Sequence, residues 1–288
     1  MSRPVLFDEP GPKGRVINVV LGVVAVVLAV AVVASLLWLM RSQLGPSKWA
    51  PFAESDTWVY YVLPGLLNTL QAALLAVVLS LIFGVLLGMG RLSQLRAISV
   101  PCGIFVEFFR SVPVLVLMVF FYSMLGPLGI LQGVYLPMAG VVLGLVFYNS
   151  TVIAELVRSG VHSLPRGQRE AGLMVGLTEG QVLRSVLLPQ AIASMLPALL
   201  NQLVVILKDT ALGYIITYQE LLQSMRIFAT VQGNLVASFL VAAAIMIVLN
   251  FALTSIAQLI QKRLSRGRRS PTAGPIAPAA GVVADPAR

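Results

Sequence analysis

The chain has 288 residues, of which 58% are hydrophobic and only 11% are charged. A soluble globular domain is usually about 45–50% apolar and about 25% charged, so this composition excludes an ordinary soluble domain. The 20 Lys and Arg against 11 Asp and Glu give a net charge of +9, but so apolar a chain is no ordinary nucleic-acid-binding protein, and we expect no nucleic-acid partner.

Charge-free apolar runs predict six membrane-spanning helices, because roughly 20 apolar residues cross a bilayer and a charge at its centre costs a few kcal/mol. The first run, residues 16–41, predicts an additional N-terminal span. A cleavable signal peptide is the alternative, although its apolar stretch normally covers only about 7–15 residues. The other predicted spans are residues 66–90, 103–125, 135–157 and 185–207, and the run between Arg226 and Lys262.

The distribution of Lys and Arg predicts which side of the membrane each loop faces. Six spans place both termini on one side. With the termini inside, the outer segments hold only Arg41, Lys48 and Arg226, and the inner segments hold most of the remaining positive residues. Because cytoplasmic loops are enriched in Lys and Arg, we expect both termini and the polar segment 158–184 to be cytoplasmic.

That polar segment predicts two short helices separated by a glycine turn. Pro165 suits the first turn of a helix, and Gly176 suits a helix end with positive φ. Thr178 to Gln181 has the form of a capping box, and Pro189 predicts a break before the fifth span. Such a pair could dock on a partner protein, or it could rest on the bilayer surface.

The same segment resembles the signature loop of binding-protein-dependent ABC importer permeases. That pattern runs Glu-Ala-Ala, three residues, Gly, nine residues, Ile, any residue and Leu-Pro. Here the spacing is identical, with Gly172 in place of the second Ala and Val186 in place of Ile. The residues carried over from this alignment are Glu170, Ala171, Gly172, Gly176, Leu188 and Pro189, of which Gly172 departs from the pattern.

Further segments, including LPGLLNTLQAALLAVVLSLIFGVLLG and VEFFRSVPVLV, resemble the polar amino-acid subfamily, and the opening VLFDEPGPK resembles actinobacterial glutamate permease subunits. The resemblance implies a type I ABC importer permease, which is an all-α integral membrane protein with six transmembrane helices and a cytoplasmic coupling-helix loop. The implied parts are a cytoplasmic segment 1–15, the additional helix 16–41, a permease domain 62–264 with its coupling loop 158–189, and a disordered tail 265–288.

The resemblance also implies the partners. Glu170, Ala171, Gly172 and Gly176 would dock on a dimer of ABC ATPase subunits, which binds ATP and Mg, and Leu188 and Pro189 would join this coupling element to the fifth span. An extracellular solute-binding protein would deliver the substrate, and a second permease subunit, identical or related, would complete the path through the plasma (inner) membrane and its lipid. This sequence contains no G-x-x-x-x-G-K-[ST] phosphate-binding loop, so we expect it to bind no cofactor and to be no enzyme.

The substrate implied is a polar amino acid, glutamate first, with glutamine, aspartate, cystine or a basic amino acid as alternatives. Polar side chains within spans often line a path, but they also form bonds between helices. Both interpretations stay open here, and the second includes an ion pair between Lys208 and Asp209. The candidate path residues are Asn149, Thr151, Asn201, Gln202, Lys208 and Asp209.

Two further pairs, Glu107 with Arg110 and Glu155 with Arg158, have i,i+3 spacing and predict salt bridges near the cytoplasmic ends of their spans. The single Cys102 and the lone His162 exclude a multi-cysteine metal site and favour packing roles, so no metal is expected. An ion-coupled secondary transporter is the rival function. An intramembrane protease is unsupported, because neither G-x-S-x-G nor H-E-x-x-H occurs.

Overall fold

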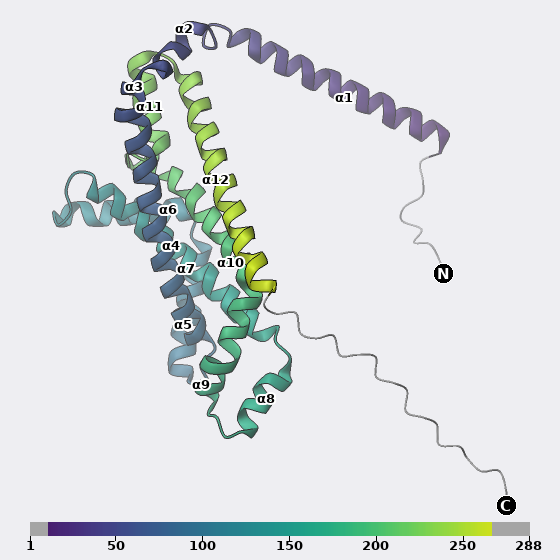
Figure 1. The fold of residues 1–288 in the computed structure, drawn as a ribbon, viewed down its shortest axis with the longest axis vertical. Helices are drawn as coiled ribbons and strands as arrows, with labels where there is room; N and C mark the ends of the chain where they lie inside the picture. Colours follow the sequence, from purple (N-terminus) through teal and green to yellow (C-terminus); the bar gives the residue numbers. More distant parts are fainter. Residues whose placement is uncertain (1–10, 267–288) are drawn as a thin grey trace, which may run out of the picture. The chain divides into compact units, whose positions relative to one another are not determined.

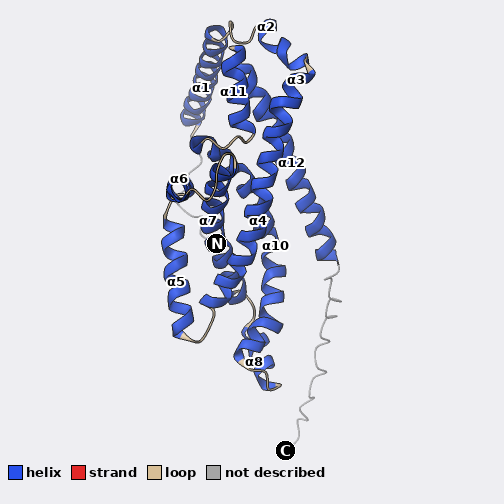
Figure 2. Cartoon of the chain, turned by 90° about the vertical axis from the view of Figure 1, so that its left-hand side faces the viewer, coloured by secondary structure: helices blue, strands red, loops and turns tan. Residues whose placement is uncertain are grey.

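The computed structural model describes residues 11–266, and within that range it contains helices and no strand (Figure 2). Residues 1–10 of the predicted segment 1–15 and residues 267–288 of the predicted tail 265–288 lie outside the described residues. The chain forms two compact units. Among the described residues, the first comprises 11–67 with 220–244, and the second comprises 68–219 with 245–266.

The first unit is built from the long helix α1, several short helices and the beginnings of two further long ones (Figure 1). Ser224 Oγ donates a hydrogen bond of 2.7 Å to the carbonyl of Tyr61, and the Phe228 ring lies 5.1 Å from the Tyr61 ring and 5.3 Å from the Phe52 ring. Its elements are α1 (Pro12–Leu39), α2 (Pro46–Trp49), a 3-10 turn (Ala50–Ala53), α3 (Ser55–Thr57), a π-helical stretch (Trp58–Val62), the start of α4 (Leu63–Arg91), α11 (Leu221–Gln232) and the start of α12 (Leu235–Arg266).

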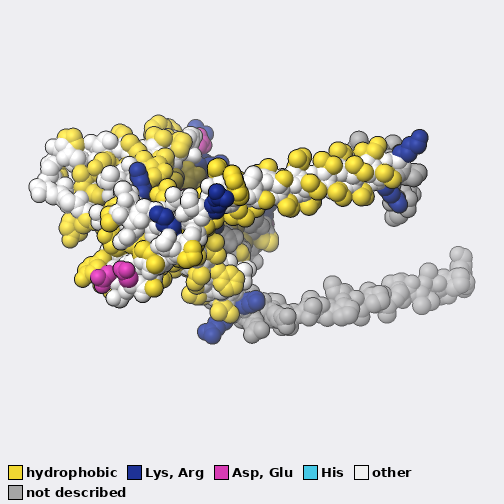
Figure 3. Space-filling model, turned by 90° about the horizontal axis from the view of Figure 1, so that it is seen from above, with side chains coloured by type: hydrophobic (Ala, Val, Ile, Leu, Met, Phe, Trp, Pro, Cys, Tyr) yellow, Lys and Arg dark blue, Asp and Glu magenta, His cyan; other side chains and the backbone are white. Residues whose placement is uncertain are grey.

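Helix α1 accounts for the first predicted span. Its apolar stretch has a mean hydropathy of 3.1, and none of it is buried against other described residues. Hydrophobic side chains cover the face of this helix that is visible in Figure 3. A helix that is apolar all round is stable where lipid surrounds it, so the helix predicted over residues 16–41 has the surface of a membrane span.

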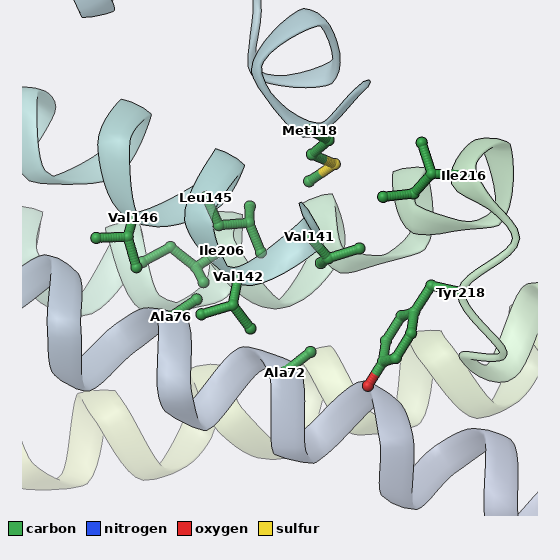
Figure 4. Packing of buried hydrophobic residues seen from close by; sticks show 10 residues of the cluster. All are labelled: Ala72, Ala76, Met118, Val141, Val142, Leu145, Val146, Ile206, Ile216 and Tyr218. Carbon is green, nitrogen blue, oxygen red and sulfur yellow. The ribbon is translucent and has the colours of Figure 1, made fainter. Parts of the chain in front are cut away.

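The second unit is organised around α7 (Tyr135–His162), which is the most buried of the long apolar helices. Met118 from α6, Leu145 from α7 and Ile206 from α10 meet in a fully buried cluster with Ala72 from α4 (Figure 4). The other elements are α5 (Arg96–Ser111), α6 (Val114–Leu125), a 3-10 turn (Gly126–Leu128), α8 (Arg166–Met174), α9 (Glu179–Gln181), a π-helical stretch (Val182–Leu187), α10 (Leu188–Asp209) and a 3-10 stretch (Thr210–Ile216).

Within residues 11–266, five helices are long and apolar enough to cross a membrane, and counting the bent pair of α5 and the segment from Val114 as one span gives six. That pair corrects the prediction of one span over residues 103–125, because α5 and the segment from Val114 meet at an angle of 101°. Pro113 has no backbone N–H, and it holds Val112 in the extended conformation (ψ 128°). The helix therefore ends before the proline, and a new one begins in another direction.

Two other boundaries also differ from prediction. The break expected at Pro189 is absent, because a π-helical stretch leads directly into α10 and places Pro189 in its first turn. Proline has no backbone N–H, so the helix loses one backbone hydrogen bond at this junction but continues through it. The run between Arg226 and Lys262 is divided by Gly233 (φ 60°), where α11 ends, so the last long helix begins at Leu235.

Candidate functional site

The segment 158–189 folds as a tight hairpin of α8 and α9 at one end of the second unit (Figure 1). Gly176 has φ 85° between the two helices, as predicted from the sequence. Thr178 and Gln181 form the predicted capping box. The Arg169 guanidinium donates two hydrogen bonds of 2.5 and 3.0 Å to the Glu179 carboxylate and so ties α8 to α9.

Gly172 is required by the packing inside this hairpin. It is buried, and a Cβ atom built on it would lie 2.9 Å from Val182 Cγ2, which is closer than real Cβ atoms approach. The glycine that replaces the second Ala of the signature pattern therefore lets α8 lie directly on the stretch after α9. Sequence analysis offered no reason for this replacement, because the contact joins residues on different helices.

The tip of the hairpin exposes apolar side chains. Met174 is 87% exposed and Val175 is 77% exposed, and the neighbouring Glu170 and Ala171 are exposed as well. Leu188, by contrast, is buried where the hairpin continues into α10. A rigid hairpin that presents apolar side chains at its tip has the surface of a protein-docking element.

Three of the candidate path residues form bonds within the helix bundle. Gln202 Nε2 on α10 donates a 2.6 Å hydrogen bond to Asn149 Oδ1 on α7. Asn149 Nδ2 in turn donates to the carbonyl of Leu145 at 2.8 Å, and Asn149 is fully buried. Thr151 Oγ1 donates to the carbonyl of Tyr148 at 2.6 Å. The bond between Gln202 and Asn149 favours the helix-bonding interpretation for these two residues, whereas the Thr151 bond stays within α7 and decides neither interpretation.

The other three candidate path residues, Asn201, Lys208 and Asp209, all belong to α10. Asn201 and Lys208 are exposed in this chain, and Asp209 is partly exposed. No ion pair within 4.0 Å joins Lys208 to Asp209 in the described part of the chain, so that predicted pair is not formed. The role of these three residues in the path stays a prediction.

An ion cluster joins the ends of three helices in the second unit. The Glu155 carboxylate on α7 accepts hydrogen bonds from Arg158 at 2.7 Å and from Arg91 of α4 at 2.5 Å. The predicted pairing of Glu155 with Arg158 is thereby confirmed. The predicted pairing of Glu107 with Arg110 is wrong: Glu107 lies 3.4 Å from Arg91, and Arg110 lies 4.0 Å from Glu155. Contacts between helices outcompete the i,i+3 neighbours on α5.

Glu220 is a structural residue of the first unit that sequence reasoning missed. Its carboxylate accepts hydrogen bonds from the backbone N–H groups of Leu222 and Gln223 at 2.7 and 2.8 Å, and it caps α11. The residue is 1% exposed. Burial raises the pKa of Glu220 to about 7, although the two amide hydrogen bonds act in the opposite direction. Its position just before an apolar helix was the available signal.

Comparison with known proteins places this geometry among transport proteins. The family model described as binding-protein-dependent transport system inner membrane component matches residues 80–266. The chain is 48% identical to the glutamate transport system permease protein GluD of Corynebacterium glutamicum, over 79% of this chain and 84% of that protein. It is 27% identical to the glutamate/aspartate import permease protein GltK of Escherichia coli O157:H7, over 70% and 93%.

A solved structure has the same fold. It is titled as the crystal structure of an amino acid ABC transporter with histidines, and the match covers 70% of this chain and 93% of that one. The TM-score is 0.64 and the identity is 28%. The bent pair α5 and α6, the α8–α9 hairpin and the central α7 all lie within the residues that the family model matches.

Proposed function

We propose a specific transport role for this chain, which belongs to the family of binding-protein-dependent transport system inner membrane components. It is a multi-pass permease subunit of an ABC importer and is no enzyme. Its solute is an amino acid, with glutamate first, because relatives at 48% and 27% identity are named as permeases for glutamate and for glutamate or aspartate. Glutamine is the nearest alternative, since a probable glutamine permease of Bacillus subtilis is 29% identical.

Separate ATPase subunits drive the cycle in this proposal, and the α8–α9 hairpin couples them to the spans. Glu170, Ala171, Gly172 and Gly176 form the docking element, and Leu188 and Pro189 continue it into α10. The single observation that carries the proposal is the exposed apolar tip at Met174 and Val175 on a hairpin braced by the Arg169–Glu179 pair. A solute-binding protein outside and a second permease subunit complete the assembly.

Transport then follows as a shift between two conformations. ATP binding on the ATPase dimer, together with Mg, draws the coupling hairpins together and favours the outward-open permease. Hydrolysis releases them and favours the inward-open one. A ligand shifts such an equilibrium only by its differential affinity for the two states, so the ATP-bound dimer has to bind the outward-open permease more tightly than the inward-open one. Both termini and the hairpin are cytoplasmic in this arrangement.

Docking is tested by placing charge on the tip. Replacing Met174 and Val175 together by Asp should abolish capture of the ATPase and ATP-driven uptake, because two carboxylates then face an apolar groove, while insertion into the membrane is retained. Co-purification of the tagged permease with its ATPase measures the result. Ile130→Asp, on an equally exposed residue of the α6–α7 link, is the control. Normal ATPase capture by the double variant would refute the docking role.

The acidic-solute assignment is tested at Lys208, which is exposed and has no ion-pair partner in the described chain. Lys208→Met should raise the KM for glutamate uptake about tenfold, the scale of one lost charge-assisted hydrogen bond. Uptake by vesicles containing the whole assembly is the measurement. An unchanged KM with normal amounts of protein counts against contact between Lys208 and solute, and uptake driven by an ion gradient without ATP supports the secondary-transporter alternative.

A further inference from the structure

A cavity of about 1030 Å³ opens between the α8–α9 hairpin and the link from α4 to α5, and all of its wall belongs to the second unit. Its size is typical of a site for a small molecule or a lipid headgroup. Neither the path through the spans nor the exposed tip of the hairpin uses it. The wall residues on which the argument rests are Leu95, Ile98, Arg166, Arg169, Glu179 and Arg184.

The wall carries an excess of positive charge. Arg169 is neutralised by Glu179 through the two hydrogen bonds across the hairpin. Arg166 and Arg184 also line the cavity, both are exposed, and no ion pair involves either of them in the described chain. Two arginines without carboxylate partners at one cavity favour an anionic group, and guanidinium groups match phosphate geometry particularly well.

The α4–α5 link and the first turn of α5 add exposed apolar side chains to the wall, beside Ser93 and Gln94. Leu95, at the start of α5, is 64% exposed, and Ile98 in its first turn is 44% exposed. A small soluble anion would gain nothing from these side chains. A ligand with a charged headgroup and a hydrocarbon chain would satisfy both the arginines and these apolar side chains, and this cavity lies at the ends of α4 and α7, where long apolar helices end.

We propose that this cavity binds an acidic phospholipid of the cytoplasmic leaflet, with its phosphate on Arg166 and Arg184 and an acyl chain along Leu95 and Ile98. The assignment rests on the proposed cytoplasmic position of the hairpin. Basic pockets between transmembrane helices on this side of a membrane bind such headgroups. Because the wall joins the α4–α5 link to the coupling hairpin, a bound lipid braces the hairpin and supports uptake.

The test measures lipid retention on the isolated full-length permease by native mass spectrometry, after exposure to phosphatidylglycerol or phosphatidylcholine. The wild type should retain phosphatidylglycerol in preference. The double variant Arg166→Gln/Arg184→Gln should weaken this binding by about fivefold for each arginine, the scale of one basic residue at an anionic surface. Lys262→Gln/Arg263→Gln removes the same charge from the end of α12 and should retain the lipid.

A further variant separates loss of the site from loss of the fold. Arg166→Lys/Arg184→Lys keeps both charges and should retain phosphatidylglycerol, with an unfolding temperature in detergent like that of the wild type. In vesicles of phosphatidylcholine alone, the wild-type assembly should import more slowly than in vesicles containing phosphatidylglycerol, and the Gln variant should lose this difference. Lipid retention is measured on the isolated permease without transport, so it tests the lipid site even if the proposed transport function is wrong.

Three outcomes would overturn the proposal. Equal phosphatidylglycerol retention by the wild type and the Gln double variant would show that Arg166 and Arg184 do not bind the lipid. Displacement of the lipid by millimolar-scale glycerol 1-phosphate would indicate a soluble phosphate compound as the natural occupant. Loss of ATPase capture in the Gln variant with unchanged lipid retention would assign both arginines to an acidic surface of that partner.

Discussion

Single polar side chains in the spans divide into those that hold helices together and those that face outward. Asn149 and Gln202 bond across α7 and α10, and Asn149 uses its amide nitrogen as well as its amide oxygen within the bundle. In a membrane such a bond contributes roughly 0.6–2 kcal/mol, since an unpaired amide finds no water to replace its partner. The residue next to Gln202, Asn201, is exposed on the same helix.

Gln202→Leu should therefore lower the free energy of unfolding by about 1–2 kcal/mol, because the buried oxygen of Asn149 loses its donor. Thermal unfolding of the purified permease in detergent measures this. Asn201→Leu is the matched control and should leave the unfolding temperature within error of the wild type. A shift in the KM for uptake with no change in stability would instead place Gln202 in the solute path.

The raised pKa of Glu220 makes the stability of the first unit depend on pH. Its pKa is about 7 in the folded chain against an ordinary value of 4.5, because burial disfavours the charged carboxylate. Between these values the folded chain binds more protons than the unfolded one, so this residue's contribution to stability falls as the pH rises from about 4.5 to about 7.

The variant Glu220→Gln should remove that slope. A neutral amide keeps one of the two hydrogen bonds to the α11 backbone, so the variant should be slightly less stable than the wild type at acidic pH and gain on it as the pH rises. Unfolding temperatures of both proteins across this pH range give the comparison. Parallel curves for the two proteins would show that Glu220 does not titrate as stated.

Between elements, close packing depends on glycines at particular contact points. A Cβ atom on Gly144 of α7 would lie 2.6 Å from Met118 Cγ and 2.8 Å from the Met118 backbone nitrogen on α6. The backbone atom cannot rotate away, so these two helices touch only because Gly144 has no side chain. Gly103 of α5 is also inside a helix, but no atom lies within 4 Å of its Cβ position.

Gly144→Ala is accordingly expected to destabilise the second unit by about 1–3 kcal/mol, the usual range for overpacking a core. Gly103→Ala should be neutral or stabilising by up to about 1 kcal/mol, since alanine favours helix and meets no obstacle. Unfolding temperatures in detergent test the pair. Equal effects of the two substitutions would contradict the contact between α6 and α7.

At the scale of the whole molecule, the single cysteine makes the proposed orientation measurable. Cys102→Ser yields a chain without thiols, into which one cysteine can be returned at a chosen loop. In intact cells a membrane-impermeant thiol reagent should label Gln132→Cys, in the α6–α7 link, but not Gln168→Cys, in the α8–α9 hairpin. Permeabilised cells, in which both are labelled, are the control. Labelling of position 168 in intact cells would invert the topology and the coupling proposal.

The sequence by itself determined those features of the structure that depend only on residues close together along the chain. Apolar runs located the long helices, Gly176 and the Thr178–Gln181 capping box defined the hairpin, and the spacing from Glu170 to Pro189 indicated the family. Hydropathy, backbone strain and capping act over a few residues, so each leaves a local pattern.

Only the tertiary structure decided which distant groups meet. The apolar run predicted one span over residues 103–125, but the structure bends it by 101° between α5 and the following helix, which both pack against α7. Arg91 pairs with Glu155 across 64 positions, and Gln202 pairs with Asn149 across 53. The cavity of Arg166 and Arg184 likewise forms only when the α4–α5 link lies beside the hairpin. Buried polar groups take the partner that packing brings within reach, and no short-range pattern records that choice.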